Sequence, residues 1–253
     1  MLTSRFCTRV LLGLDAAKPY FPRRETTTTG TPVRPEILKL PTRADAARLF
    51  GLDPAKTTIL VTGGSQGARR LNELAAQAAV LLPPDFQIIH IAGALDHARV
   101  SEITGSRLNH KVLGFCDQMP AAYALADLVI ARSGASSLTE IAICGHPSIL
   151  VPFPFAADDH QTRNAEVFAQ AGAARLIQER DLDAEKLAAM ATRILGDPAT
   201  RAAMSAAART LAFPDAADRV CAAIESTLVA GASGSCLPQN VAGPSGTRPL
   251  SHP

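Results

Sequence analysis

The chain has 253 residues, of which 47% are hydrophobic and 19% are charged. This length allows one large domain or two small ones, and this apolar content is enough to bury a sizeable core. The 25 Lys and Arg residues against 23 Asp and Glu residues leave a net charge of +2, which gives no electrostatic argument for a nucleic-acid partner and excludes disorder over the whole chain. Aromatic residues make up only 4%, so stacking platforms for bases are scarce.

The cysteines and the apolar runs indicate a cytoplasmic protein. Five cysteines without a C-x-x-C pair predict reduced thiols rather than disulfides or a zinc site. No stretch reaches the roughly 18 apolar residues of a membrane span. The apolar run at residues 10–14 is too short for a signal peptide, so we expect an uncleaved chain. The cysteines are Cys7, Cys116, Cys144, Cys221 and Cys236.

The order of expected elements predicts a Rossmann-like α/β domain. Residues 9–30 give two weak strand signals, and residues 30–35 read as a turn. After that, short apolar runs rich in β-branched residues alternate with Ala- and Leu-rich segments of helical spacing, which predicts a parallel sheet with helices on both faces. The expected strands are 57–62, 87–92, 111–115, 127–131, 147–151 and 175–178, and the expected helices between them are 68–82, 95–104, 119–126, 136–144 and 160–171.

Three further helices and a polar tail are expected after the last strand. Asp197-Pro198 and Phe213-Pro214 divide this region into helices over 183–195, 199–211 and 215–229. Residues 230–253 contain 12 Gly, Ser or Pro, so we expect a disordered tail there.

A glycine-rich loop, Gly63 to Ala68, follows the first strong strand and opens a helix. This arrangement is typical of an anion site, because free backbone N–H groups and the helix dipole favour a phosphate. We prefer a ligand over an empty turn, since three glycines in five residues weaken a turn that needs none of them. NAD is disfavoured, because the next strand ends at Ile91-Ala92-Gly93 without the acidic residue that a dinucleotide fold requires.

A second loop, Arg132 to Glu140, also joins a strand to a helix. Ser136 or Ser137 is expected to cap that helix, and Glu140 is expected in its first turn. Taken alone, this is an ordinary helix start. Ligands of open α/β sheets bind beyond the carboxyl ends of the strands, so two such loops at one crevice predict a diphosphate and a ribose, with Glu140 accepting from the ribose diol.

The third loop, residues 151–164, has prolines at its start and polar side chains at its end. Gln161 and Asn164 carry both donors and acceptors, which suits sugar hydroxyls. We interpret Asp158 and Asp159 as a helix cap and solvated loop rather than a metal pair. His160 is either a catalytic base or a surface residue, and the surface role is favoured.

Several longer motifs follow one another over residues 9–227. They are GGSQGAR, GFCDQM with AAYALAD, RSGASSLTEIA and VPFPFAADDHQ-x-x-NA, with YFP and GTPVRPEI upstream. Taken in this order, the motifs resemble the MurG family, the N-acetylglucosaminyltransferases that convert lipid I to lipid II in bacterial peptidoglycan synthesis. The resemblance implies the carboxy-terminal half of a GT-B glycosyltransferase. Residues 1–35 would be a remnant or linker, 36–229 the UDP-GlcNAc-binding domain and 230–253 the tail.

The resemblance also implies roles for individual residues. The donor diphosphate would meet Arg34 and the first loop, the backbone at Cys116 would read the uracil edge, and Glu140 would hold the ribose. Gln161 would bind the GlcNAc hydroxyls, with Asn164 nearby. No resident metal is expected, although a divalent cation could accompany the diphosphate. The first-loop residues are Gly64, Ser65, Gln66 and Gly67, and the residues lining the nucleotide are Ala135, Ser136, Ser137, Leu138 and Thr139.

The sequence departs from the family at its start, where nothing before Arg9 resembles the amino-terminal domain. That domain carries a candidate catalytic base and the acceptor and membrane-binding surface. We therefore expect this chain alone to bind UDP-GlcNAc weakly and to transfer nothing, and the full-length enzyme to be a peripheral protein at the inner face of the bacterial plasma membrane. The alternatives are a donor-binding subunit with a separate acceptor-domain partner, a non-catalytic UDP-sugar-binding remnant and, as an outsider, an NAD-dependent reductase.

Overall fold

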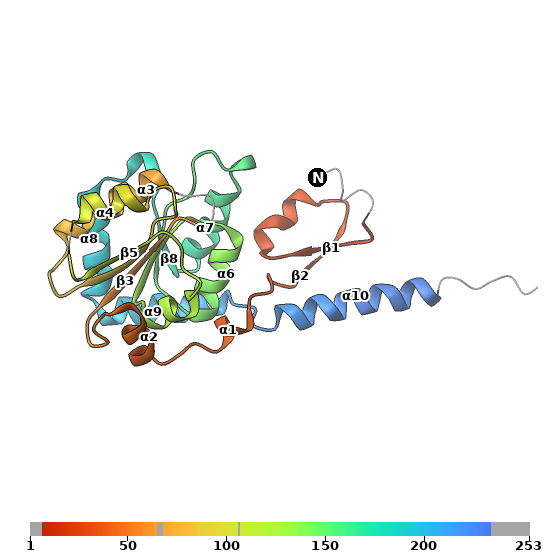
Figure 1. Ribbon diagram of the computed structural model, residues 1–253. Coiled ribbons are helices and arrows are strands. Elements are labelled where there is room, and N and C mark those ends of the chain that lie inside the picture. Colours follow the sequence, from red (N-terminus) through yellow and green to blue (C-terminus); the bar gives the residue numbers. More distant parts are fainter. Residues whose placement is uncertain (1–6, 65–67, 106, 234–253) are drawn as a thin grey trace, which may run out of the picture.

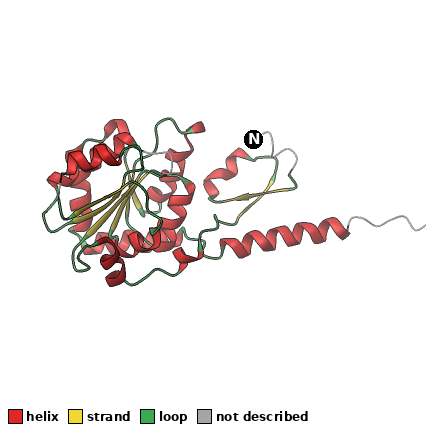
Figure 2. Ribbon diagram, in the orientation of Figure 1, coloured by secondary structure: helices red, strands yellow, loops and turns green. Residues whose placement is uncertain are grey.

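The main body of the protein is a six-stranded parallel sheet with helices on both faces (Figures 1 and 2). The computed structural model describes residues 7–64, 68–105 and 107–233. The strand order is β5-β4-β3-β6-β7-β8. The strands are β3 (Thr58–Thr62), β4 (Gln87–Ile91), β5 (His110–Leu113), β6 (Leu128–Ala131), β7 (Ser148–Leu150) and β8 (Ala174–Leu176).

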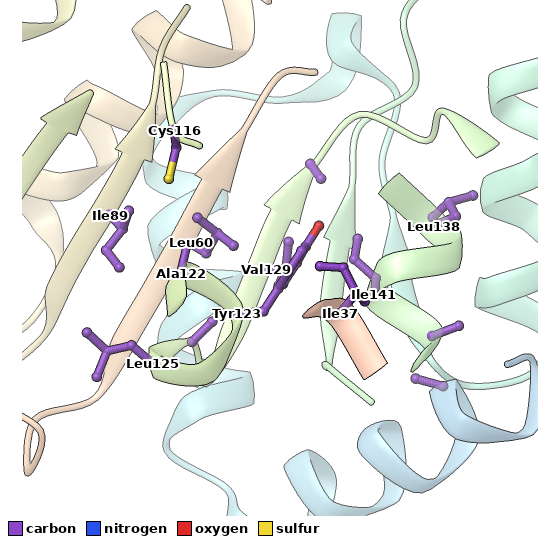
Figure 3. Close-up of a cluster of buried hydrophobic side chains, with 14 of the residues drawn as sticks. Ile37, Leu60, Ile89, Cys116, Ala122, Tyr123, Leu125, Val129, Leu138 and Ile141 are labelled. Carbon is purple, nitrogen blue, oxygen red and sulfur yellow. The ribbon is translucent and has the colours of Figure 1, made fainter. Parts of the chain in front are cut away.

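The helices confirm the predicted alternation and bury two hydrophobic clusters, one on each face of the sheet. One face is covered by α3 and α8, and the other by α2, α5, α6 and α7. Figure 3 shows the second cluster, in which Tyr123, Val129 and Leu138 come from different elements. The helices are α1 (Pro35–Leu38), α2 (Arg43–Phe50), α3 (Arg69–Leu81), α4 (His97–Thr104), α5 (Met119–Leu125), α6 (Ala135–Cys144), α7 (His160–Gln170), α8 (Ala184–Leu195), α9 (Pro198–Thr210) and α10 (Ala216–Ser233).

The strand order creates a switch point between β3 and β6. Chain order runs outward from β3 through β4 to β5 on one side, and from β6 through β7 to β8 on the other. The loops that leave β3 and β6 therefore diverge and leave a crevice at the carboxyl edge of the sheet, which is the usual ligand site of such folds. The two glycine- and serine-rich loops of the sequence are those that leave β3 and β6.

A small unit precedes the main body and lies beside α10 (Figure 1). It contains β1 (Arg9–Leu12), β2 (Glu25–Thr28) and the 3-10 helix η2 (Asp15–Tyr20), and β1 pairs with β2 in parallel. The two weak strand signals in residues 9–30 are therefore confirmed. The guanidinium of Arg9 donates to the hydroxyl of Ser226 on α10 at 3.3 Å, which links this unit to the last helix.

Three local expectations were wrong. Helix α2 was not predicted, although Thr42 caps it by accepting from the Asp45 N–H at 3.1 Å and Gly51 ends it at a φ of 67°. Helix α1 begins at Pro35, where only a turn was expected. Helix α10 continues to Ser233, past the predicted start of the tail, because residues 230–233 keep the helical backbone. Residues 234–253 lie outside the described part of the chain.

Candidate functional site

A pocket of about 480 Å³ lies at the carboxyl ends of β3, β6 and β7. We call it the switch-point pocket. It brings together parts of all three loops singled out in the sequence. Its lining residues are Gly63, Gly64, Arg132, Gly134, Ala135, Ser136, Ser137, Phe153, Phe155, Ala156, Ala157, His160 and Gln161.

Two glycines of the first loop, Gly63 and Gly64, are required by the turn itself. A Cβ on Gly63 would lie 2.3 Å from the Cβ of Ala68, and Gly64 has a φ of 77°, a left-handed conformation that favours glycine. The argument that the turn needs none of its glycines was therefore wrong for these two. Gly64 does reach the pocket. Ser65, Gln66 and Gly67 lie outside the described residues.

The second loop starts α6 differently from the prediction. The N-cap is Gly134, so Ser136 and Ser137 lie inside the first turn and do not cap the helix. Both serines line the pocket, where unpaired N–H groups of a helix start favour an anion. Ala135 also lines it, whereas Leu138 is fully buried in the core beneath α6. Three residues of the predicted five-residue stretch, Ala135, Ser136 and Ser137, thus line the pocket.

Thr139, the last residue of that stretch, turns its side chain back onto its own helix. Its hydroxyl donates to the carbonyl of Ala135 at 2.9 Å, and only 8% of the residue is exposed. This hydroxyl is therefore used within α6 rather than offered to a ligand.

Glu140 lies in the second turn of α6, because the helix already begins at Ala135. The dipole argument for this carboxylate was therefore wrong. Its surroundings come from other elements: Tyr123 on α5 donates its hydroxyl to one carboxylate oxygen at 3.0 Å, and an Arg34 nitrogen lies 3.9 Å from the other. Burial raises the pKa of Glu140, while Tyr123 and Arg34 act in the opposite direction.

Arg34, Cys116 and Glu140 do not belong to the lining of the switch-point pocket. Arg34 is near both of the others, since it lies 3.9 Å from the Glu140 carboxylate and its charge acts on the Cys116 thiol. The Arg34 side chain is half exposed and precedes α1, which packs against α6. Cys116 is 9% exposed, and its side chain belongs to the core cluster of Figure 3. Burial raises the pKa of its thiol, so the neutral thiol is favoured over the reactive thiolate.

Gln161 and Asn164 both bind the backbone of Ser133. The amide oxygen of Gln161 accepts from the N–H groups of Ser133 and Phe153 at 3.2 and 3.0 Å, and Asn164 donates to the Ser133 carbonyl at 3.2 Å. The hydroxyl of Ser133 returns a hydrogen bond to the Gln161 carbonyl at 2.7 Å. These bonds fasten α7 to the loop after β6. Within the described chain, the Gln161 amide nitrogen has no such partner, and Gln161 lines the pocket.

Arg132 is a functional candidate that the sequence reasoning missed. Arg132 is only 5% exposed and lines the pocket. Its guanidinium donates to the carbonyl oxygens of Val151 and Pro152 at 3.1 and 3.0 Å. The same guanidinium pairs with Glu179 and lies 5.5 Å from the ring centre of Phe153. Arg132 thus connects the ends of β6 and β7 and supports the aromatic wall. Its only sequence signal was its place in the RSGASS motif.

The third loop reaches the pocket through an unusual turn. Asp158 and Asp159 both have a φ of 52°, which is rare outside glycine. Asp159 occupies the N-cap position of α7 without capping it, although its carboxylate accepts from the Thr162 hydroxyl at 2.6 Å. His160 is exposed, as expected of a surface residue, and also lines the pocket.

Across residues 7–64, 68–105 and 107–233, no helix is long and apolar enough to cross a membrane. The same ranges contain no group of three or more His, Cys, Asp or Glu side chains that could hold a metal ion.

The comparisons with known proteins agree with this arrangement. The sequence profile of the glycosyltransferase family 28 C-terminal domain matches residues 58–220. The chain belongs to glycosyltransferase family 28. The chain is similar to the crystal structure of Acinetobacter baumannii MurG, with a TM-score of 0.70 and 32% sequence identity. The match covers 89% of this chain and 62% of the MurG chain.

Two curated relatives carry the name UDP-N-acetylglucosamine--N-acetylmuramyl-(pentapeptide) pyrophosphoryl-undecaprenol N-acetylglucosamine transferase. The protein of Solibacter usitatus is 40% identical over 226 residues, which cover 88% of this chain and 60% of that protein. The protein of Xanthomonas campestris pv. campestris (strain 8004) is 45% identical over 219 residues, which cover 86% and 49%. The resemblance to the MurG family and the expected fold class are confirmed, and the chain spans about half to three fifths of these relatives.

Proposed function

We propose that this chain binds UDP-GlcNAc across the switch-point pocket and the adjoining Arg34–Glu140 pair. The observation that carries the proposal is the convergence of the β3 loop, the start of α6 and Gln161 on one pocket at the switch point. A helix start and glycine-loop N–H groups suit a diphosphate, and the amide nitrogen of Gln161 suits a sugar hydroxyl. The names of the relatives, which are N-acetylglucosamine transferases, support this choice of donor.

The proposed roles follow the positions of the side chains. Gly64 with Ser65, Gln66 and Gly67, together with Ala135 to Ser137, would hold the diphosphate, and Arg34 would add a positive charge to it. Glu140 lies one helical turn beyond the serines and would accept from the ribose diol. The backbone at Cys116 would read the uracil edge. Leu138 and Thr139 support the site from within α6 rather than touching the nucleotide with their side chains.

We further propose that the donor serves an inverting transfer of GlcNAc to lipid I. The acceptor hydroxyl attacks the anomeric carbon, UDP departs with the electrons of the broken C–O bond, and a base takes the proton of the hydroxyl. Arg34 and the N–H groups at the start of α6 would stabilise the developing charge on the leaving diphosphate. We expect the base and the membrane-facing acceptor surface to come from an acceptor domain or partner chain at the inner face of the plasma membrane. A divalent cation would arrive with the diphosphate rather than reside in the protein.

Calorimetric titration of the purified chain with UDP-GlcNAc, UDP and NAD tests donor binding. We expect saturable binding of UDP-GlcNAc and UDP and none of NAD. Glu140→Gln should weaken UDP binding by about tenfold, which corresponds to about 1.4 kcal/mol for lost charge-assisted hydrogen bonds. Glu73→Gln, a substitution on α3 away from the pocket, is the matched control. NAD binding as tight as UDP binding would contradict the proposal.

A 2′,3′-dideoxy analogue of UDP separates ribose recognition from a general loss of charge. The analogue lacks the diol, so the wild-type chain and Glu140→Gln should bind it equally. If Glu140→Gln still weakens binding of the analogue tenfold, Glu140 does not act through the ribose. A transfer assay with lipid I and labelled UDP-GlcNAc completes the test, and robust turnover by this chain alone would overturn the proposed need for a separate acceptor domain.

A further inference from the structure

A second pocket of about 300 Å³ adjoins the switch-point pocket. It lies between η2 of the small unit and the start of α7, and we call it the η2–α7 pocket. Ala157 and His160 line both pockets, so the two share a wall. The lining residues of the second pocket are Ala16, Ala17, Tyr20, Phe21, Ala157, Asp158, His160, Arg163 and Asn164.

The walls of the η2–α7 pocket differ in chemistry. The η2 side is apolar and aromatic, with two alanines followed by Tyr20 and Phe21. The α7 side carries a carboxylate, an imidazole, a guanidinium and an amide. The guanidinium of Arg163 lies 4.8 Å from the centre of the Tyr20 ring, which joins the two walls by a cation–π contact. An apolar wall opposite a polar wall suits a sugar ring, which presents C–H groups on its faces and hydroxyls at its edge.

His160 on the shared wall has a defined hydrogen-bonding state. Its Nδ1 lies 2.7 Å from the carbonyl oxygen of Ala157, and a carbonyl can only accept, so Nδ1 carries a proton. In its neutral form the ring then presents Nε2 as an acceptor, and Nε2 has no hydrogen-bond partner within the described ranges. A hydroxyl that enters between the two pockets would find this acceptor beside the donor sugar.

We propose that the η2–α7 pocket receives the sugar ring of the acceptor, next to the GlcNAc of the donor. The inference rests on the proposed function and adds a subsite to it. Transfer requires the acceptor hydroxyl within reach of the anomeric carbon, so the acceptor sugar must occupy space that adjoins the donor pocket. The η2–α7 pocket does so through Ala157 and His160. Residues 16–21, which the sequence suggested to be linker, then form one wall of the acceptor site.

Protein-observed NMR with a soluble acceptor fragment tests the subsite. The probe is N-acetylmuramyl-L-alanyl-D-isoglutamine, added to labelled chain that is saturated with UDP. We expect shifts of the Ala16 and Ala17 methyl signals and of the Arg163 side-chain N–H. Ala17→Leu fills the pocket and should weaken probe binding at least tenfold with unchanged UDP affinity. Ala98→Leu, at an exposed position of α4, is the matched control and should leave both affinities unchanged.

The outcomes separate this inference from the proposed function. If UDP itself does not bind, the proposed function fails. If UDP binds and the probe leaves the pocket signals unmoved, or binds Ala17→Leu as well as wild type, the subsite is refuted. Arg163→Gln, at an exposed position of α7, gives the same test should Ala17→Leu fail to fold, with an expected several-fold loss of probe affinity and none of UDP affinity.

Discussion

Replacing Arg132 by methionine should destabilise the protein strongly and disorder the wall of the switch-point pocket. The Arg132 side chain is 6% exposed and its partner Glu179 is 16% exposed, so the ion pair is largely shielded from water. Its removal leaves a buried carboxylate without its cation and two carbonyls, those of Val151 and Pro152, without their donor. Breaking a buried pair on one side costs about 3–5 kcal/mol, a large fraction of a typical domain's stability.

Urea unfolding followed by far-ultraviolet circular dichroism measures this cost. Arg132→Met should lower the free energy of unfolding by about 3–5 kcal/mol, and Arg132→Met combined with Glu179→Met should recover much of that loss, since two apolar side chains leave no unpaired charge. Exposed Arg70→Met on α3 is the control and should change stability by less than about 0.5 kcal/mol. A loss below about 1 kcal/mol for Arg132→Met, within the range of exposed pairs, would refute the reasoning.

Two further stability predictions follow from buried groups. Burial lowers the pKa of His146 from 6.5 to about 4. Between these pH values the unfolded chain binds a proton that the folded chain does not bind. The resulting stability is therefore present above pH 6.5 and is lost as the pH falls toward 4. His146→Gln should therefore reduce the loss of unfolding free energy between pH 7 and 5.5 by about 1 kcal/mol. Urea titrations at the two pH values measure this loss, and an equal loss in His146→Gln and in the wild type would count against the prediction. Gly63→Ala should lower the free energy of unfolding by about 1–3 kcal/mol, because the new Cβ would lie 2.3 Å from the Cβ of Ala68. Gly134→Ala has open space around the new Cβ and should lower the free energy of unfolding by less than about 1 kcal/mol. Similar thermal midpoints for the two variants would contradict the steric argument.

The sheet could be predicted because its strands are nearly continuous apolar runs. Buried parallel strands contact helices on both faces, so a run such as residues 58–62, all buried, carries its own signal. Helix α2 lacks such a signal, since only three of its eight residues are buried, and its boundaries depend on Thr42 and Gly51. The sequence therefore indicated the fold class well and the short peripheral helices poorly.

The sequence predicts which loops form the site, but not which side chains pair within it or which residue caps α6. Loops after β3 and β6 must meet at the switch point, so the convergence of Gly64 and Ser136 followed from topology alone. The bond between Arg132 and Glu179, by contrast, joins residues 47 positions apart and depends on how η4 (Glu179–Asp181) packs. The shift of Glu140 from the first to the second turn depended on whether Gly134 or a serine caps α6. No local pattern decides either point.

Mapping UDP-GlcNAc onto the labelled chain by amide chemical shifts tests the central claim most directly. If the donor binds as proposed, the largest shifts should fall on Gly64, on residues 134–137 and on Gln161, with smaller shifts near Glu140 and Cys116. Amides around the hydrogen bonds between Asp53 and Gln87, at the amino ends of β3 and β4 and so at the opposite edge of the sheet, should keep their chemical shifts. Absence of saturable shifts, or shifts confined to residues outside the switch-point pocket, would contradict the claim that this pocket is the donor site.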